Sequence, residues 1–216
     1  MNIKHYCIVI LFTIFSIGAS AQLGIKAGIN MANETKSFSN NDVSAGYKSE
    51  NLTGYQMGFV YQILHKKSGF GFETGASISQ KGSFFSFDST TVGNSVREGY
   101  KEINYLEVPL NLRYKLSLGF IGVYGFGGLY GGYVLSSKTV DEILDVTVVG
   151  KYSGFTSRID FGYNFGAGLE LLKKIQLGAT WSKGLKNTSN FNQPEDMTVP
   201  FKSTNGVYSI NLVYLF

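Results

Sequence analysis

Few residues of this sequence could do chemistry, and the first to consider is its histidine. His65 is the only histidine beyond the first ten residues, and it lies in a polar segment beside Lys66 and Lys67. Serine–histidine catalysis needs a base within hydrogen-bond reach of a nucleophile and a third group that orients the base. No acidic residue is placed near His65 in the sequence. We therefore predict no catalytic residue, and a membrane-embedded lipid-modifying enzyme is the alternative that the sequence favours least.

Metal and cofactor sites also lack their usual patterns. The sequence has one cysteine, Cys7, and no regular carboxylate loop of the calcium-binding type. The glycines between Gly125 and Gly132 belong to a strand-like segment and do not precede a helix, so they do not form a phosphate cradle. We predict neither a metal nor a cofactor.

Six charged residues occupy the polar face of segments that otherwise alternate between apolar and polar: Lys26, Glu73, Lys81, Glu107, Arg113 and Asp160. A charge on the inner face of a closed sheet needs a partner, because an isolated buried charge is costly. Counted from the short connections, Glu73 and Arg113 fall at similar heights on neighbouring strands. We predict that these two pair, with Lys26 close by, and that the other three form a second, higher layer. The predicted role is structural, as salt bridges that fill the lumen, and the alternative is a proton or ion path.

The elements that must position these charges have the period of two that is typical of strands with two different faces. In most of them one face is bulky and apolar, and the other is Gly, Ser, Asn or Gln with a few charges. The faces of one segment, 120–135, cannot be assigned, and Val213 and Leu215 break the polarity of the last. The eight segments are 22–30, 52–64, 70–79, 105–114, 120–135, 159–169, 175–182 and 208–216.

Short and long connections alternate between these segments. Three are short, at 65–68, 117–119 and 171–174; four are long and polar, near 31–51, 82–101, 136–157 and 186–204. Outer-membrane barrels have short periplasmic turns and longer extracellular loops. We predict an all-β fold: an eight-stranded antiparallel up-and-down transmembrane β-barrel with its apolar side chains facing lipid. A soluble, lipocalin-like carrier with the opposite facing is the alternative. Side chains just fill an interior of eight strands, so a diffusion pore is not expected.

The first residues have the pattern of a signal peptide. Lys4 and His5 precede an apolar run, 8–17, and the small residues Ala19-Ser20-Ala21 form a cleavage site. We expect residues 1–21 to be removed and residues 22–216 to form the barrel domain in the outer membrane of a Gram-negative cell. The few basic residues in excess of acidic ones do not argue for a nucleic-acid partner.

Every second residue of the last segment is aromatic or aliphatic: Tyr208, Ile210, Leu212, Tyr214 and Phe216. This resembles the terminal-strand signature that the barrel-assembly machinery recognises, and the alternative is an ordinary amphipathic strand. The long connections contain several aromatic residues among polar ones. These residues are expected to bind a surface ligand or a protein partner, and the alternative is that they only pack the loops against each other. They are Phe38, Tyr47, Phe84, Phe85, Phe87 and Phe191.

Four stretches resemble PorT-like outer-membrane β-barrel proteins, a family typical of Bacteroidota. They are Leu-Gly-Ile-Lys-Ala-Gly-Ile-Asn at 23–30, Tyr-Leu-Glu-Val-Pro-Leu-Asn-Leu-Arg-Tyr-Lys at 105–115, Ile-Asp-Phe-Gly at 159–162 and Trp-Ser-Lys-Gly-Leu-Lys-Asn at 181–187. The resemblance implies the fold and a Gram-negative outer membrane. The family's namesake is linked to secretion and gliding machinery. We expect a non-enzymatic integral barrel with a structural or surface-binding role, or an accessory of a cell-envelope assembly, with a secretion or gliding component as the alternative.

Overall fold

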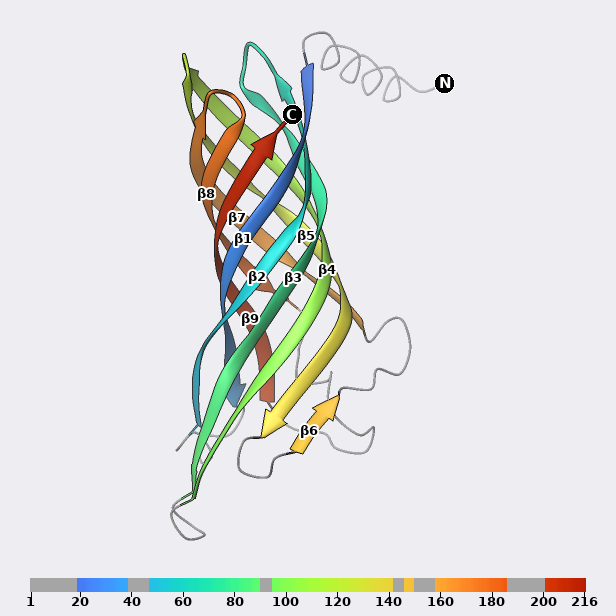
Figure 1. The fold of residues 1–216 in the computed structure, drawn as a ribbon, viewed down its shortest axis with the longest axis vertical. Helices are drawn as coiled ribbons and strands as arrows, with labels where there is room; N and C mark the ends of the chain where they lie inside the picture. Colours follow the sequence, from blue (N-terminus) through green and yellow to red (C-terminus); the bar gives the residue numbers. More distant parts are fainter. Residues whose placement is uncertain (1–18, 39–46, 90–94, 142–145, 150–157, 186–200) are drawn as a thin grey trace.

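The alternating segments form long antiparallel strands in the computed structural model, which describes residues 19–38, 47–89, 95–141, 146–149, 158–185 and 201–216 (Figure 1). Among these residues, no helix is long and apolar enough to span a membrane. The strands are β1 (Ala19–Phe38), β2 (Tyr47–His65), β3 (Phe70–Ser89), β4 (Ser95–Leu118), β5 (Ile121–Asp141), β6 (Val146–Val149), β7 (Ile159–Leu171), β8 (Ile175–Gly184) and β9 (Phe201–Leu215).

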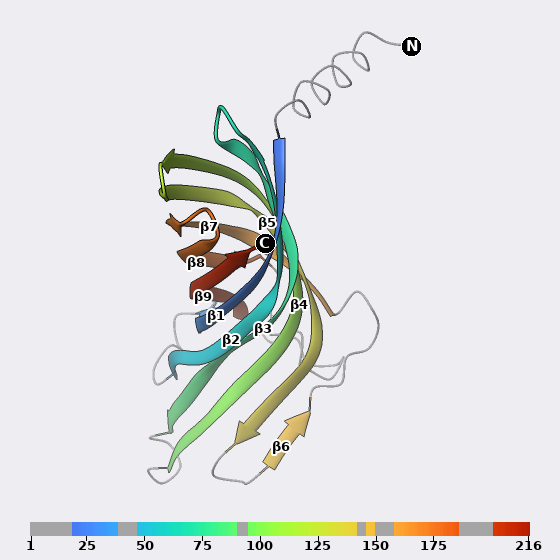
Figure 2. The ribbon, with the colours of Figure 1, turned by 45° about the horizontal axis from the view of Figure 1, so that its top comes forward.

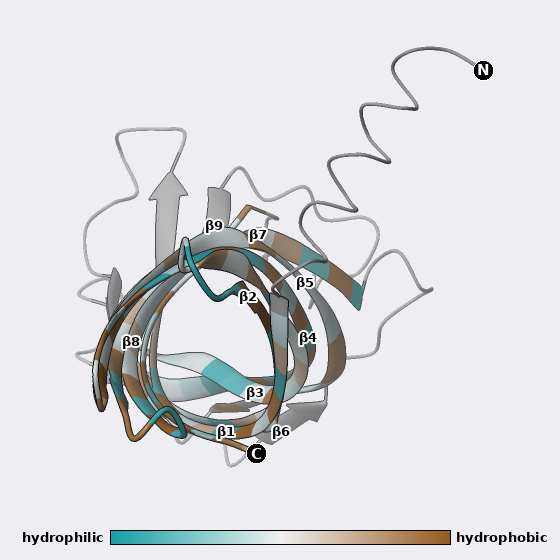
Figure 3. Cartoon of the chain, turned by 90° about the horizontal axis from the view of Figure 1, so that it is seen from above, coloured by the Kyte–Doolittle hydropathy of each residue, from teal (hydrophilic) through white to brown (hydrophobic). Residues whose placement is uncertain are grey.

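Eight of these strands close into a barrel. Strand pairing follows the order β4-β3-β2-β1-β9-β8-β7-β5, and a further pairing of β4 with β5 joins the two ends. Seen along its axis, the chain makes a closed ring (Figure 3). The prediction of an eight-stranded antiparallel up-and-down barrel is confirmed. The short strand β6 was not predicted, and it pairs with the end of β5 at 138–141, outside the barrel.

The strands are longer than predicted at the end of the barrel that carries the long connections, which we call the loop-side end. Much of the segments near 31–51 and 82–101 was expected to be loop, but β1 continues to Phe38 and β3 to Ser89, both still paired with their neighbours. Figure 2 shows β2 to β5 projecting beyond the rest of the barrel. The expectation was wrong because backbone pairing continues where side chains no longer alternate between lipid and lumen.

The side chains face as the alternation predicted. Leu110 is 63% exposed and Phe161 53%, whereas Arg113 is 2% exposed and Asp160 1%. The apolar outer wall is therefore the lipid-facing one, and the charges lie inside. The lumen is less uniformly polar than expected, because Val60, Val213 and Leu215 pack together inside it. The two residues that seemed to break the polarity of the last strand thus have a structural reason to be apolar.

Three tight turns define the opposite, turn-side end, and two of them depend on glycine. Gly69 (φ 73°) ends the β2–β3 turn, and Gly119 (φ 74°) lies in the β4–β5 turn. The surroundings of the two glycines differ. A Cβ at Gly69 would lie 2.1 Å from the carbonyl oxygen of Lys115, whereas a Cβ at Gly119 would have nothing within 4 Å.

These surroundings predict unequal costs for one substitution. Gly119→Ala should lower the free energy of unfolding by about 1 kcal/mol, the cost of a left-handed backbone with a Cβ. Gly69→Ala should cost about 1–3 kcal/mol more, because the turn must also move away from β4. Unfolding by urea in lipid vesicles, followed by the fluorescence of Trp181, the single tryptophan, measures both. Equal losses for the two variants would contradict the structure.

Candidate functional site

The polar lumen holds the predicted charged residues, and its turn-side half contains a series of side-chain contacts that begins and ends on strand β4. Lys115 Nζ lies 3.0 Å from Glu170 Oε1, and Gln176 Nε2 donates to Glu170 Oε2 over 2.7 Å. Gln176 is hydrogen-bonded to Gln62, whose Nε2 donates to Glu73 Oε2 over 3.0 Å. Glu73 then pairs with Arg113. We call these six residues the turn-side ring: Gln62, Glu73, Arg113, Lys115, Glu170 and Gln176.

The turn-side ring starts and ends on the same strand. Lys115 and Arg113 belong to β4, and the side chains between them come from β7, β8, β2 and β3. Two ion pairs, Lys115–Glu170 and Arg113–Glu73, are joined by the two glutamines, so each of these charges has an opposite partner. Because such contacts tie strands that are distant around the barrel, the ring crosses the lumen and braces it.

Large aromatic side chains of β5 fill the space beside the ring. The guanidinium carbon of Arg113 lies 3.7 Å from the centre of the Tyr124 ring. Tyr124 itself fits because two facing residues are glycines: a Cβ at Gly168 would be 2.5 Å from the Tyr124 hydroxyl oxygen, and one at Gly178 would be 2.4 Å away. Gly166 and Gly162 leave room in the same way for Phe126 and Tyr130. Strand β5, whose faces could not be assigned from the sequence, therefore directs these three aromatic rings inward.

A second network includes strands β1 and β9, which the turn-side ring does not reach. Asn30 of β1 donates to Ser79 Oγ over 3.1 Å and accepts hydrogen bonds from Gln56 and Ser209 over 3.0 and 2.8 Å. Gln56 also donates to Asn211 of β9, whose Nδ2 donates to Thr180 of β8 over 3.0 Å. These neutral groups satisfy one another without a net charge. We call this set the amide network: Asn30, Gln56, Ser79, Thr180, Ser209 and Asn211.

The loop-side half of the lumen holds the second predicted layer. Lys81 pairs with Glu107, and its Nζ lies 4.8 Å from the centre of the Tyr130 ring. Asp160 interacts electrostatically with Lys81, and its Oδ1 accepts the backbone N–H of Phe161 over 2.9 Å. Further toward the loop-side end, an apolar cluster fills the interior with three fully buried side chains: Ile103, Tyr105 and Val134.

The structure places all six charges singled out from the sequence on the inner face: Glu73 with Arg113, Lys81 with Glu107 and near Asp160, and Lys26 close to the first pair. Lys26 lines the same central cavity as Glu73 and Arg113 but joins neither ion pair. The Lys115–Glu170 pair was missed. Both residues lie on the inner face close to a short turn, which was a usable signal, but β5 separates their strands. Only knowledge of how the barrel closes brings them together.

The cavity left between the two networks is small. Its volume is about 80 Å³, and it is lined by side chains of both. This is room for a few water molecules and not for an aqueous channel. Among the described residues there is no group of histidine, cysteine and acidic side chains that could hold a metal ion.

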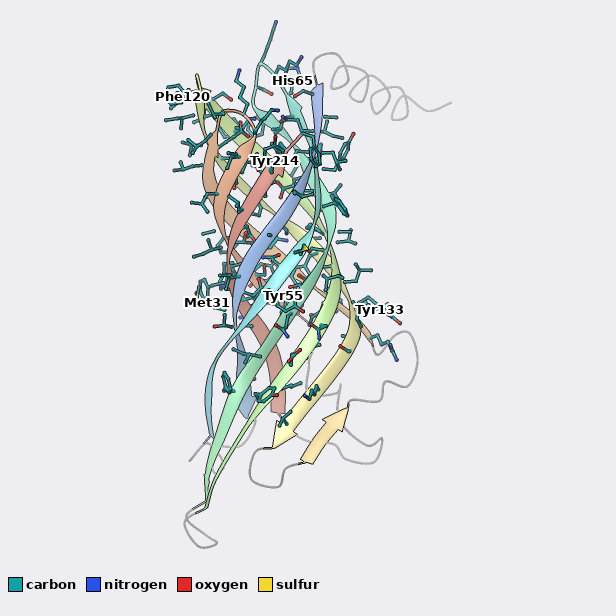
Figure 4. The ribbon with its side chains drawn as sticks, viewed as in Figure 1. Met31, Tyr55, His65, Phe120, Tyr133 and Tyr214 are labelled. Carbon is teal, nitrogen blue, oxygen red and sulfur yellow. The ribbon has the colours of Figure 1, made fainter. Side chains whose placement is uncertain are left out.

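Two aromatic clusters mark the outer wall at different heights. Near the turns, Phe70 lies 4.5 Å from Tyr114, measured between ring centres. Further toward the loop side, Trp181 lies 4.7 Å from Phe165 and 5.6 Å from Tyr163. Figure 4 shows the labelled Tyr214 near the turns and Tyr133 toward the other end. Aromatic girdles at the two edges of an apolar band are typical of membrane barrels.

A closed sheet with an apolar wall, aromatic girdles and a polar, hydrogen-bonded interior defines a membrane β-barrel. The family model for the outer membrane protein beta-barrel domain matches residues 15–190, and the chain belongs to this family. No curated protein matches the sequence.

Solved outer-membrane barrels are similar in structure at low sequence identity. OprG from Pseudomonas aeruginosa is 15% identical with a TM-score of 0.48, covering 92% of this chain and 97% of that one. Neisserial surface protein A is 9% identical with a TM-score of 0.45, covering 92% and 99%. Ail of Yersinia pestis, solved in complex with the heparin analogue sucrose octasulfate, is 13% identical with a TM-score of 0.43, covering 91% and 99%.

The ring leads to a prediction about stability. Arg113→Gln should lower the free energy of unfolding by about 3–5 kcal/mol, because it leaves the Glu73 carboxylate buried without its cation. Glu73→Gln combined with Arg113→Gln should cost clearly less than the two single losses added together. Urea unfolding in vesicles measures all three variants. Lys183→Gln, at an exposed lysine, is the matched control and should stay within about 0.5 kcal/mol. Additive losses would mean that the pair does not act as a unit.

Proposed function

We propose that the protein is a non-enzymatic, non-conducting integral outer-membrane barrel that acts through its outer surfaces. The role is structural or surface-binding, or that of an accessory in a cell-envelope assembly. The observation that carries this proposal is the filled lumen. The pocket that lies between the turn-side ring and the amide network has a volume of about 80 Å³, and an apolar cluster around Tyr105 fills the lumen further toward the loop side. A barrel whose lumen is filled in this way would contact other molecules with its outer wall and its two ends.

The proposed orientation places the turn-side end in the periplasm. Short periplasmic turns and longer extracellular connections are the rule for such barrels. We also propose that residues 1–21 direct export and are then removed. Strand β1 begins at Ala19, so cleavage after Ala21 would shorten it by three residues and leave its pairing from Gln22–Gln62 onward.

The loop-side end is the proposed binding surface for a ligand or a protein partner. The projecting strands β2 to β5 carry it away from the membrane (Figure 2). Phe84, one of the aromatic residues singled out there, is exposed and lies 6.0 Å from Tyr100 between ring centres. Phe191 falls outside the described residues, and for the remaining aromatic residues of this set the structure describes only the strand backbone.

The geometry around His65 supports a structural role for this residue and not the lipid-modifying alternative. His65 lies at the turn-side end (Figure 4). The backbone N–H of Ser68 is directed at His65 Nδ1 over 3.3 Å, and the Ser68 hydroxyl lies 3.1 Å from the same atom. Contacts between the first and last residues of a four-residue turn stabilise the turn. They occupy the nitrogen that an orienting acid would need to hold.

The secretion or gliding alternative depends on the PorT-like resemblance. Within its longest stretch, 105–115, the inward residues Glu107, Arg113 and Lys115 all form ion pairs in the lumen. The resemblance therefore rests on residues that hold the barrel together. It supports a shared fold, and we do not extend the proposal to secretion.

Electrical recording tests the proposed function directly. The refolded protein, reconstituted in planar bilayers, should show no stable conductance steps, because the pocket between the two networks has room for only a few water molecules. Folding is checked first by gel migration, since a barrel migrates differently when it has not been boiled. Fractionation of cells should find the protein in the outer membrane. Regular conductance steps from a folded sample would refute the proposal.

The outward face of β9 is the proposed assembly signal, and a substitution can test it separately from stability. Its five residues are all exposed on the outer wall: Tyr208, Ile210, Leu212, Tyr214 and Phe216. Phe216→Ser should reduce the amount of barrel in the outer membrane of cells several-fold, while refolding into vesicles in vitro stays near normal. Phe216→Tyr keeps the aromatic ring and should behave as the parent. Equal amounts of all three proteins in the membrane would exclude this role.

A further inference from the structure

A groove in the outer wall runs across five neighbouring strands, from β9 over β1, β2 and β3 to β4. It arises because large and small outward residues face each other on neighbouring strands: Ala27 is paired with Met57, and Ala76 with Phe59. Each alanine leaves a depression beside a large side chain. The groove has a volume of about 580 Å³, and its lining includes Ile78.

One end of this groove lies next to positive charge. Tyr214 of β9 lines the groove and is paired with Ile25, which also lines it. Lys174 Nζ lies 6.0 Å from the centre of the Tyr214 ring. The β7–β8 turn that carries this lysine is fixed to the same wall, because the backbone N–H of Leu215 donates to the Lys174 carbonyl oxygen over 2.7 Å.

Lys173 adds a second cation at this place. It is exposed, and its carbonyl oxygen accepts a hydrogen bond of 3.5 Å from the side chain of Gln22 on β1. The turn is tight, with positive φ at Leu172 and Lys173 and a hydrogen bond from Lys174 N–H to the Leu171 carbonyl oxygen. The two lysines therefore stand at the rim above the strands that form the groove.

We infer that the groove and the two lysines together bind one anionic phospholipid of the periplasmic leaflet. Its phosphate lies at Lys173 and Lys174, and one acyl chain passes Tyr214 and lies in the groove. This inference rests on the proposed orientation, since only that orientation puts the lysines at the headgroups of the phospholipid-facing end. Half of a hydrocarbon core is about 15 Å thick. Neighbouring strands lie about 4.8 Å apart, so a groove that begins at Tyr214 on β9 and crosses β1, β2 and β3 to Leu106 on β4 extends about 19 Å over four such steps, enough for a chain of one leaflet.

The charge and the shape favour a phospholipid over other occupants. A second copy of the chain or a partner's apolar surface would fill the groove without needing the lysines beside it. A lipopolysaccharide would lie at the opposite rim. Only a molecule with an anionic head and an apolar tail, held at this depth, uses both features.

Native mass spectrometry of the refolded, delipidated full chain in detergent tests the inference, with phosphatidylglycerol and phosphatidylcholine of identical acyl chains as probes. The parent protein should retain phosphatidylglycerol more strongly, and Lys173→Gln with Lys174→Gln should lower that retention roughly tenfold, since each lysine near an anionic surface contributes substantially. Ala76→Leu, which fills the groove, should lower the retention of both lipids.

Two control variants make the result specific. Lys138→Gln removes an exposed lysine at the other end, and Ala179→Leu enlarges an outward alanine of β8 away from the groove; both should retain lipid as the parent does. Unboiled gel migration shows that each variant is folded, so a failed barrel is distinguished from a failed lipid site. Equal retention of the two lipids by the parent, or no change in the double lysine variant, would overturn the inference. So would a dimer that Ala76→Leu abolishes.

Discussion

Hydrocarbon offers no hydrogen bonds to a backbone, and the rest of this structure follows from that constraint. The pairing of β1 with β9, the first and last strands of the barrel, closes the sheet, so that every strand of the barrel is paired on both sides. Closure then fixes the facing: apolar side chains meet lipid, and the polar ones share an interior too narrow for bulk water. Polar groups enclosed in this way must satisfy one another. The turn-side ring and the amide network are the consequence, because together they tie all the barrel strands except β5 across or around the lumen.

Strand β5 contributes by volume where the other strands contribute by hydrogen bonds. Tyr124, Phe126 and Tyr130 project inward over glycines of β7 and β8, where a Cβ would come within 3 Å of a ring. A few large side chains thus occupy space that many small ones would otherwise leave open. The Tyr124 ring also covers the guanidinium of Arg113, and the Tyr130 ring lies beside Lys81. The aromatic rings of β5 consequently contact the cations of both ion-pair layers. A substitution that changes the packing of one of these rings would therefore also change the surroundings of a buried charge.

The sequence predicted what the membrane imposes and missed what it does not. Alternation revealed the eight strands, the faces of all of them except β5, and the three tight turns, because lipid on one side and a narrow lumen on the other act on successive residues. Beyond the bilayer the outer face of a strand no longer meets lipid and need not be apolar, so the extensions of β1 to β5 left no alternating pattern. Pairs on adjacent strands, such as Glu73 with Arg113, were within reach of a register argument. The Lys115–Glu170 pair joins β4 to β7 across β5, so an argument from adjacent strands could not find it. Val213 seemed misplaced on the polar face until its contacts with Val60 and Leu215 explained why it is apolar.

A braced lumen also determines where specificity can reside. Substitutions inside the barrel disturb networks that hold several strands, so most of the interior is committed to stability. The outer wall is less constrained, because lipid accepts any apolar side chain. A place where small and large outward side chains lie next to each other therefore needs its own explanation. Ala27 and Ala76 beside Met57 and Phe59 are such a departure, and they lie on the wall that Lys174 borders. The strand extensions at the other end face water and share this freedom. The features that distinguish this barrel from others therefore belong on its outside.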